Sequence, residues 1–344
     1  MFSQSAMKCK YFFSIIFIFF ICFLVAAGCG RDLELDPQDV TITLPSRLYV
    51  VNSDSASLSI INTETNTVES SISLAGPLGE TPWEIALSPD GKKAYVTLPN
   101  VWMVVEVDII NNIGRNYFDA KGGAAGIVVS PDGKFAYTAN YHSSSVSKID
   151  LETESTSTLD IDHPISLAIN TDGTRLFVLN LDQHMLSVIS AESMAKIGTV
   201  LCGISPYGID FSSANNRVYV ANFGSANLSI VNPSTNAVEA FVMMPSGAYP
   251  NDVAVSPNGK FTFVANFGRD DVSVVDLTTR SVIKSIPVGQ DPFAIVSSTD
   301  GKKVYVTNLS SDTVSVIDTG TLSVEATIAV GDAPRGLAYG GSGL

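Results

Sequence analysis

The sequence is poor in cysteine, histidine and positive charge. Its 344 residues include four Cys and three His, and 20 Lys plus Arg face 34 Asp plus Glu, for a net charge of −14. No run of Lys or Arg offsets this balance locally, so nucleic acid is excluded as a partner. The chain also lacks a Ser-His-Asp order, a phosphate-binding loop and paired-cysteine metal spacing, and these absences argue against the common hydrolases and nucleotide enzymes.

The N-terminus has the pattern of a secretory signal. Lys8 and Lys10 precede an uncharged apolar run, residues 11–25, which is followed by Ala26-Ala27-Gly28 and then Cys29. Small residues directly before a Cys resemble the lipobox of bacterial lipoproteins, although Ala26 stands where Leu is commonest. The resemblance implies that residues 1–28 are a signal peptide and that Cys29 is cleaved free and acylated. The alternative is an uncleaved membrane anchor, since the apolar run is nearly long enough to span a bilayer.

Both alternatives place the body of the protein outside the cytoplasm, lipid-anchored or membrane-anchored at the cell envelope. The polar residues 29–45 are expected to be a tether, and residues 46–344 the folded domain. Cys9 and Cys22 leave with the signal, which makes Cys202 the one cysteine of that domain. An intramolecular disulfide is therefore excluded, and stability must come from packing.

An internal repeat fills the rest of the chain. An aromatic residue recurs at Tyr49, Tyr95, Tyr137, Phe177, Tyr219, Phe263 and Tyr305, with spacings of 46, 42, 40, 42, 44 and 42. Three residues later six copies have Asn, and the second copy has Leu98. A turn such as SPDGK precedes the aromatic, and a short apolar strand such as VSVID follows the Asn. The repeat predicts one supersecondary unit of about 42 residues, used seven times.

Each unit is expected to contain four short antiparallel strands. Asp-Gly supplies the positive φ that a tight turn needs, and the Asn that ends the second strand can bond its own backbone and tolerate a left-handed conformation. Segments such as VYVT and VSVI are apolar or small on both faces, which is typical of a sheet buried on both sides. The pattern predicts an all-β, seven-bladed β-propeller with four antiparallel strands per blade.

The chain ends predict how the ring closes. Residues 334–340, PRGLAYG, match a first strand without a second, and residues 47–52, RLYVVN, match a second strand without a first. Pairing of the C-terminal strand with the N-terminal blade would complete one sheet and leave no open edge.

The repeated Y-V-T-N with a following V-S-V-I-D resembles the YVTN family of β-propeller repeats, over residues 46 to 340. The resemblance implies a seven-bladed propeller in surface-layer, periplasmic or lipoprotein contexts, in which the motif is structural and brings no common catalytic residue. The wider superfamily includes lactonases, haem d1 domains and quinoprotein-like propellers, and no motif in this chain selects one of them.

Two groups of residues are candidate sites on the face that carries the blade-to-blade loops. The first is a metal site for a divalent ion, formed by His142, His163 and His184 with Asp162 or Cys202, because imidazole and carboxylate suit zinc or copper. Its alternative is a chance gathering of loop residues. The second group lines the mouth of the axial channel, where aromatic rings can stack on a ligand and charged groups can bind a polar one. It comprises Trp83, Glu84, Tyr207, Asn251, Asp252, Phe293 and Arg335, and its alternative is packing of the blade edges.

These features favour a non-enzymatic binding or scaffold module for a protein or a small molecule. The domain is expected to be monomeric, to reach the membrane through lipid on Cys29, and to need no cofactor unless the divalent metal is real. The alternatives are a lactonase-like or metal-assisted hydrolase and a propeller that binds a metal or redox cofactor, because a fold of this kind does not determine function.

Overall fold

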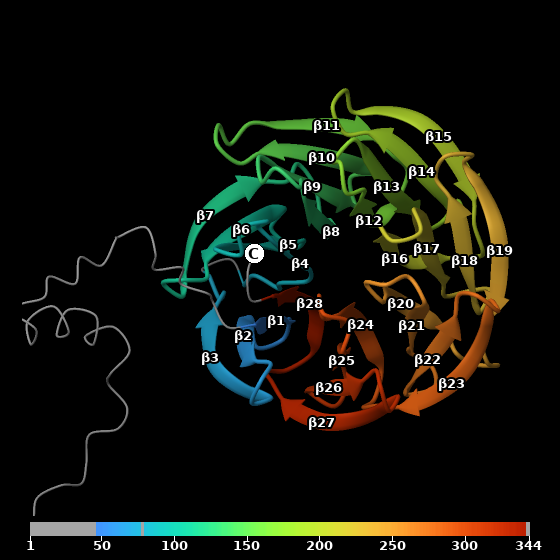
Figure 1. The fold of residues 1–344 in the computed structure, drawn as a ribbon. Coiled ribbons are helices and arrows are strands. Elements are labelled where there is room, and N and C mark those ends of the chain that lie inside the picture. Colours follow the sequence, from blue (N-terminus) through green and yellow to red (C-terminus); the bar gives the residue numbers. More distant parts are fainter. Residues whose placement is uncertain (1–45, 77–78, 342–344) are drawn as a thin grey trace, which may run out of the picture. The chain divides into compact units, whose positions relative to one another are not determined.

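The computed structural model describes residues 46–76 and 79–341. They form seven four-stranded antiparallel sheets arranged around a central opening (Figure 1). This confirms the predicted seven-bladed β-propeller. The predicted signal peptide, the tether and Cys29 lie outside the described residues. Within the part that the structure describes, no helix has the length and hydropathy needed to cross a membrane.

The sheets are numbered here as blades in chain order, each from the inner to the outer strand. Blade 1 contains β28 (Pro334–Gly340), β1 (Arg47–Asn52), β2 (Ser57–Asn62) and β3 (Thr67–Ser73); blade 2 contains β4 (Ile85–Leu87), β5 (Lys93–Leu98), β6 (Met103–Asp108) and β7 (Ile113–Asp119); blade 3 contains β8 (Ala124–Val129), β9 (Phe135–Asn140), β10 (Ser145–Asp150) and β11 (Thr156–Asp160). Blade 4 contains β12 (Pro164–Ile169), β13 (Arg175–Asn180), β14 (Met185–Ser190) and β15 (Ala195–Leu201); blade 5 contains β16 (Pro206–Ser212), β17 (Arg217–Asn222), β18 (Asn227–Asn232) and β19 (Ala237–Met243). Blade 6 contains β20 (Pro250–Val255), β21 (Phe261–Asn266), β22 (Asp271–Asp276) and β23 (Ser281–Pro287), and blade 7 contains β24 (Pro292–Ser297), β25 (Lys303–Asn308), β26 (Thr313–Asp318) and β27 (Ser323–Ala329).

The ring closes as predicted. The C-terminal strand β28 pairs antiparallel with β1, with Tyr49 opposite Ala338 and Leu48 opposite Tyr339. A further backbone bond, from Gly336 N to the carbonyl of Trp83, joins blade 1 to blade 2. Closure therefore lies within residues 46–341, and the inner strands surround the axis without an exposed inner edge.

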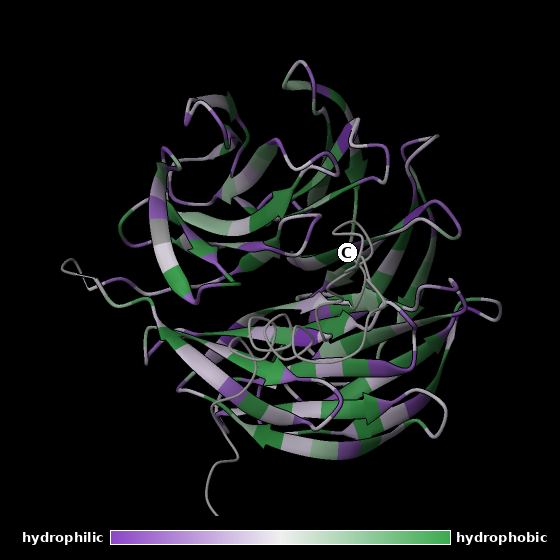
Figure 2. Cartoon of the chain, turned by 60° about the vertical axis from the view of Figure 1, so that its left-hand side comes forward, coloured by the Kyte–Doolittle hydropathy of each residue, from purple (hydrophilic) through white to green (hydrophobic). Residues whose placement is uncertain are grey.

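The middle strands are buried on both faces because each blade packs between two neighbours. Strand β25 has a continuous run of buried residues from Val304 to Asn308, and the equivalent run recurs in the second strand of every blade. Hydrophobic residues concentrate along the strands and hydrophilic ones in the connecting loops (Figure 2). The seven repeated aromatic residues are each at most 4% exposed, which confirms that they belong to the core.

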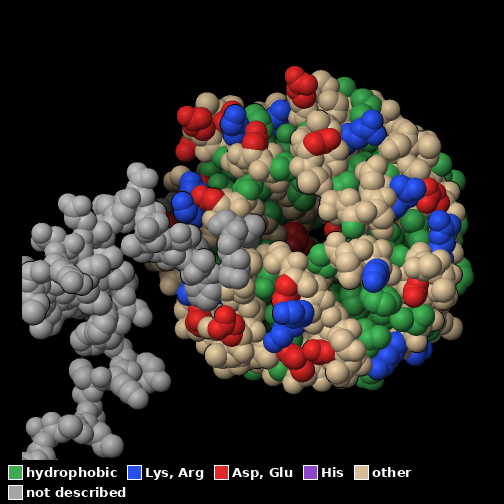
Figure 3. Space-filling model, viewed as in Figure 1, with side chains coloured by type: hydrophobic (Ala, Val, Ile, Leu, Met, Phe, Trp, Pro, Cys, Tyr) green, Lys and Arg blue, Asp and Glu red, His purple; other side chains and the backbone are tan. Residues whose placement is uncertain are grey.

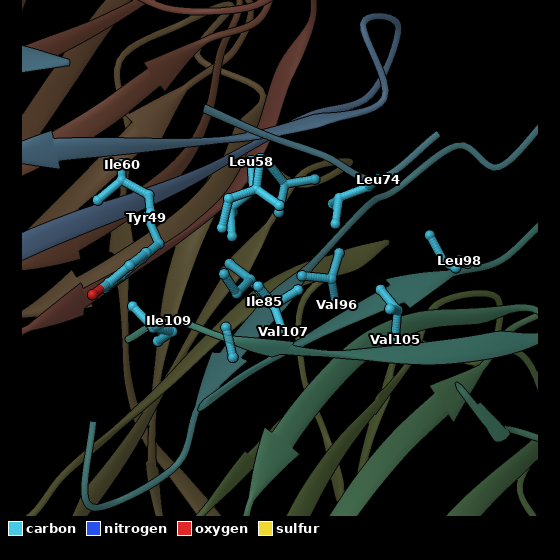
Figure 4. Packing of buried hydrophobic residues seen from close by; sticks show 13 residues of the cluster. Tyr49, Leu58, Ile60, Leu74, Ile85, Val96, Leu98, Val105, Val107 and Ile109 are labelled. Carbon is cyan, nitrogen blue, oxygen red and sulfur yellow. The ribbon is translucent and has the colours of Figure 1, made fainter. Parts of the chain in front are cut away.

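Seven hydrophobic clusters fill the seven interfaces between blades. In one of them, residues of blade 1 such as Tyr49 and Ile60 pack against Ile85, Val96 and Val107 of blade 2 (Figure 4). The other six clusters join the remaining neighbours around the ring in the same way. Every blade therefore packs against both of its neighbours, and the core is shared around the ring.

The repeated Asn has a structural role different from the one that its sequence context predicts. Asn308 Nδ2 donates to Ser315 Oγ at 2.9 Å, and Asn308 Oδ1 accepts from Gly289 N at 3.1 Å. The side chain thus joins the second strand to the third strand and to the preceding blade-to-blade loop. None of these Asn residues has a positive φ, so none adopts the left-handed conformation that Asn tolerates.

The second copy of the repeat, which has Leu98 in place of the Asn, shows why the bond between the Asn and the Ser matters. Six blades combine the Asn with a Ser on the third strand, whereas blade 2 has Leu98 and, opposite Val96, Val105. Leu98 and Val105 are 0% and 2% exposed and belong to the same hydrophobic cluster. A polar pair has been replaced by an apolar pair, which avoids a buried hydrogen-bonding group without a partner.

Candidate functional site

The first strand of each blade lines the axial channel. In every blade but the third it follows a proline, and the position after that proline supplies Trp83, Tyr207, Asn251, Phe293 and Arg335 of the predicted site. The next position supplies Glu84 and Asp252. Trp83, Glu84, Tyr207, Asn251, Asp252 and Phe293 all line one small cavity, and Arg335 lies over the ring of Trp83. The structure therefore gathers these seven predicted residues at the mouth of the channel on the loop side.

An arginine closes this mouth. The guanidinium of Arg335 lies 3.9 Å from the ring centroid of Trp83 and 4.9 Å from that of Phe293. Tyr207 meets Phe293 edge to face, with their centroids 6.3 Å apart. Burial lowers the pKa of Arg335 from its usual value, and no ion pair joins it to Glu84 or Asp252 among the described contacts. The cavity beneath measures about 40 Å³, room for roughly three water molecules at 10–15 Å³ each.

The channel widens towards the opposite face, where the S-P-D-G turns lie. A cavity of about 420 Å³ opens there, between the inner strands of blades 5, 6 and 7. Its lining residues include Asp210 and Asp252 and the hydroxyl-bearing Ser212, Ser213, Ser297 and Thr299. Ser256 and Ser298 also line it, but their hydroxyls bond within their own turns. This volume lies within the range of small-molecule sites, whereas the loop-side cavity is far below it. Red acidic side chains are visible within the central opening in Figure 3.

Three carboxyl groups lie around the channel: Glu84 and Asp252 occupy the same position of their blades, and Asp210 lies two positions further along its inner strand. Burial raises the pKa of Glu84 to about 8, that of Asp252 to about 7 and that of Asp210 to about 6. The charge of Asp252 adds to the effect on Glu84, and the charge of Asp210 adds to the effect on Asp252. Backbone N–H groups offset part of the burial. Asp210 Oδ2 accepts from Val255 N at 2.8 Å, and Asp252 Oδ2 accepts from Ile295 N at 3.0 Å.

These hydrogen bonds also have a structural effect, because each acid bonds the inner strand of the next blade. Asn251 does the same through Nδ2, which donates to the carbonyl of Phe293 at 2.7 Å. Part of the site therefore holds blades 5, 6 and 7 together at the axis, as the blade-packing alternative expects. With these pKa values Glu84 is mostly protonated at neutral pH, whereas Asp210 is mostly ionised and Asp252 is partly ionised. The two aspartates therefore leave the channel a partial negative charge that a cation can compensate.

Sequence reasoning missed Asp210 and the wider mouth. The six other blades have Ala or Val at the position of Asp210, which the strand register identifies as Ala86, Val128, Ala168, Ala254, Val296 and Ala338. A comparison of the seven copies at this position singles out the one acid. The width of the channel depends on how far the inner strands splay, and no repeat pattern encodes that.

The three histidines lie on loops of blades 3 and 4. His184 Nδ1 accepts from Ser205 N at 3.1 Å, and Asp270 and Asp312 make the equivalent bond to Asp291 N and Ala333 N. His184 therefore bonds a loop backbone, as these aspartates do on their own blades. His142 packs beside Gly123 and edge-on to the ring of Tyr141.

Of the three histidines, His163 lies beside charged side chains. Its Nδ1 lies 3.2 Å from both Asp162 Oδ1 and Asp182 Oδ2, and its ring lies against Tyr141. Over residues 46–76 and 79–341, no group of three or more His, Cys, Asp or Glu is placed to hold a metal ion. Cys202 is 8% exposed, and burial raises the pKa of its thiol to about 12. The metal site stays a prediction without geometric support.

The fold and the channel define the class of protein: a seven-bladed β-propeller with an axial, acid-lined cavity. Residues 257–340 match the family model described as YNCE-like beta-propeller, which agrees with the resemblance to YVTN repeats. None of the curated proteins matches the chain in sequence.

Solved structures resemble the chain in fold. A functionally unknown protein from Desulfotomaculum acetoxidans has a TM-score of 0.75 at 18% identity, over 86% of this chain and 99% of that one. Hydrazine synthase from Kuenenia stuttgartiensis has a TM-score of 0.71 at 18% identity, over 85% and 99%. Dihydro-heme d1 dehydrogenase NirN has a TM-score of 0.63 at 14% identity, over 92% and 78%. Identities this low show the propeller fold alone.

Proposed function

We propose that this protein is a non-enzymatic ligand-binding propeller, held at the cell envelope by lipid on Cys29. Its ligand is a small polar molecule with a positive charge, which enters the channel from the face of the S-P-D-G turns. The observation that carries the proposal is the 420 Å³ cavity whose lining includes two half-buried aspartates and several hydroxyl-bearing residues.

Charge favours a cation at this position. Asp210 and Asp252 bond backbone N–H groups and no basic side chain among the described contacts. A protonated amine would relieve their mutual repulsion and would in turn lower their raised pKa values. Serine and threonine hydroxyls around the rim can donate to or accept from the rest of such a ligand. The Arg335 stack at the other end keeps the ligand from passing through.

Other cavities suit this role less well. A larger groove of about 610 Å³ lies between blades 3 and 4, but Lys148 lies along it and donates to the carbonyl of Ala191 at 2.9 Å. The residues that line the axial cavity include no His, Cys or Lys, so its serines have no partner of the Ser-His or Ser-Lys kind there, which favours binding over hydrolysis. Enzymatic and metal-dependent activity stay alternatives that no specific contact favours.

Thermal unfolding in the presence of amine probes tests the proposal. Polyamines and amino sugars are compared with their N-acetylated forms, which keep the shape and lose the charge. We expect the charged probes alone to raise the unfolding midpoint, and we expect Asp210→Asn with Asp252→Asn to abolish the effect. Asp162→Asn with Asp182→Asn, on the opposite face, is the matched control. Equal effects of charged and acetylated probes, or retention of the effect in the channel variant, would contradict the proposed site.

A further inference from the structure

One position at the outer, loop-side edge carries a long apolar side chain in blades 4 and 5, whereas the other blades have a polar residue, a proline or an alanine there. The register places one residue of each outermost strand opposite the first residue of the third strand; these residues are Ser73, Asp119, Asp160, Leu201, Met243, Pro287 and Ala329. Leu201 and Met243 are 67% and 63% exposed, the largest exposures among the described large hydrophobic residues. Of these seven equivalent residues, two have long apolar side chains, and these two lie on neighbouring blades.

The blade-to-blade loops show the same departure. Ile204 N donates to Ser225 Oγ, as Gln290 N does to Ser311 Oγ and Asp332 N to Ser55 Oγ, so the three residues share one position. In that position Ile204 is 53% exposed. In the next blade-to-blade loop, between β19 and β20, the residue before Pro250 is Tyr249. The equivalent residues of other blades are His163, Asp291 and Ala333.

These residues form one surface, here called the apolar edge: Leu201, Ile204, Phe241, Met243 and Tyr249. Tyr249 stacks on Phe223 at 5.2 Å, and Ile204 lies against Gly224 of the same loop. Phe241 and Met243 are two residues apart on β19, are both exposed, and therefore point to the same side. Phe223 and Gly224 of the β17–β18 connection thus contact Tyr249 and Ile204 of the connections on either side, and Leu201 and Met243 occupy equivalent positions on β15 and β19.

Charge is absent from all three connections. Residues 201–206 (LCGISP), 223–227 (FGSAN) and 243–250 (MMPSGAYP) contain no Asp, Glu, Lys or Arg. The equivalent loops of other blades are acidic, with Asp119, Asp160, Asp162, Asp291 and Asp332. In a chain of net charge −14, this is the sector of the loop face that an apolar or headgroup surface would repel least.

We propose that the apolar edge lies on the surface of a lipid bilayer and inserts its side chains between the headgroups. Large aliphatic residues beside a tyrosine, without charge, are the composition of segments that lie in a membrane interface. The chain outside the described residues supports this occupant, since its residues 11–25 are uncharged and apolar and are followed by a 17-residue stretch, 29–45. At about 3.3–3.6 Å per residue, that stretch can reach roughly 55–60 Å when extended, enough for the domain to turn its loop side to the membrane.

Docking would orient the channel. The apolar edge lies at the loop side, and the wide cavity opens at the side of the S-P-D-G turns. A propeller that rests on its loop side therefore presents the cavity away from the bilayer. This inference rests on the anchored location in the proposed function, and it is independent of the ligand.

Fluorescence quenching in vesicles tests the docking. The full chain is reconstituted in phosphatidylcholine vesicles with brominated acyl chains, and tryptophan is introduced by Ile204→Trp or, as the matched position on blade 7, Gln290→Trp. The emission of Trp83 and Trp102, the two native tryptophans, is subtracted by means of the parent chain. We expect the added emission of I204W to shift to the blue and to be quenched by bromine, and that of Q290W to stay unquenched.

A second substitution checks the surface itself. Leu201→Asp with Met243→Asp in the I204W chain should abolish the quenching, whereas Ala329→Asp should leave it intact. Asp119 and Asp160 occupy the same position in blades 2 and 3, so the fold accepts this residue, and circular dichroism verifies it.

Three outcomes would overturn the inference. They are equal quenching of I204W and Q290W, no quenching of either, and a blue shift of I204W without quenching, which would indicate a protein contact instead. Flotation of the vesicles measures the anchoring of the chain separately from the docking of the apolar edge. A chain that does not float contradicts the proposed anchoring, and the same quenching is then measured after the chain is mixed with preformed vesicles.

Discussion

Replacing Glu84 with Gln should make the propeller more stable at alkaline pH. Glu84 lies at the narrow part of the channel, where its Oε1 accepts from Ile85 N at 3.1 Å and burial raises its pKa from 4.5 to about 8. Between these two values the folded chain retains a proton that the unfolded chain releases, so stability falls as the pH rises through this window. Gln keeps the size and the hydrogen-bond acceptor but has no charge, so this part of the loss disappears.

The size of the effect follows from the shift. A rise from 4.5 to about 8, at about 1.4 kcal/mol per pKa unit, gives about 5 kcal/mol, and solvent contact of a partly exposed side chain reduces this to about 3–5 kcal/mol. We expect E84Q to be nearly neutral at about pH 5 and to raise the free energy of unfolding by about 3–5 kcal/mol at about pH 9.

Urea unfolding of residues 46–344, followed by far-ultraviolet circular dichroism, measures both values. The exposed Glu64→Gln is the control for a change of net charge. An E84Q effect of the same size at both pH values would refute the reasoning, because it would mean that the side chain acts through packing and not through a buried charge.

Three further predictions concern the scaffold around the site. Asn308→Leu should lower the free energy of unfolding by about 2–4 kcal/mol, because Ser315 Oγ and Gly289 N lose their partner. Adding Ser315→Val recreates the Leu98–Val105 pair of blade 2 and should recover at least about 1 kcal/mol in a double-mutant cycle. A fully additive cycle would contradict the coupling. His184→Asp should change the free energy of unfolding by no more than about 0.5 kcal/mol, because aspartate makes the same loop bond at Asp270 and Asp312. His184→Leu removes this bond and should cost about 1 kcal/mol, measured by urea unfolding. Equal losses in the two variants would disprove the role of His184 in holding the loop. Cys202 should react with iodoacetamide only on unfolding, because its thiol is buried with a pKa of about 12. Fast labelling of the native propeller, detected by mass spectrometry, would show that the interface between blades 4 and 5 opens.

Most of the fold could be predicted from the sequence because a repeat states the same structure seven times. The aromatic at Tyr305 and its equivalents marked the buried second strand, and the half-units at both ends marked the closure between β1 and β28. The role of Asn308 was wrong in detail. An Asn at the end of a strand commonly bonds its own turn. The partner of Asn308, Ser315, comes seven residues later on the next strand, and the pairing register of that strand cannot be read from the sequence.

The candidate site could be predicted only in part. The residues after the prolines were gathered as expected, since equivalent positions of seven inner strands must surround one axis. Which mouth is open could not be predicted, because it depends on how Arg335 stacks on Trp83 and on how far the inner strands diverge near Ser212 and Ser256. Asp210 was missed because a single acid in PYGIDFS resembles an ordinary solvent-facing residue of a strand.

The central claim is that the channel holds buried carboxyl groups that a cation can neutralise. Carbon-13 NMR of the Asp and Glu carboxyl groups, followed through a pH titration of residues 46–344 and assigned with D210N, D252N and E84Q, tests it most directly. The account predicts titration of Asp210, Asp252 and Glu84 at about 6, 7 and 8. Titration of all three near the ordinary values of 3.8 for Asp and 4.5 for Glu would contradict it.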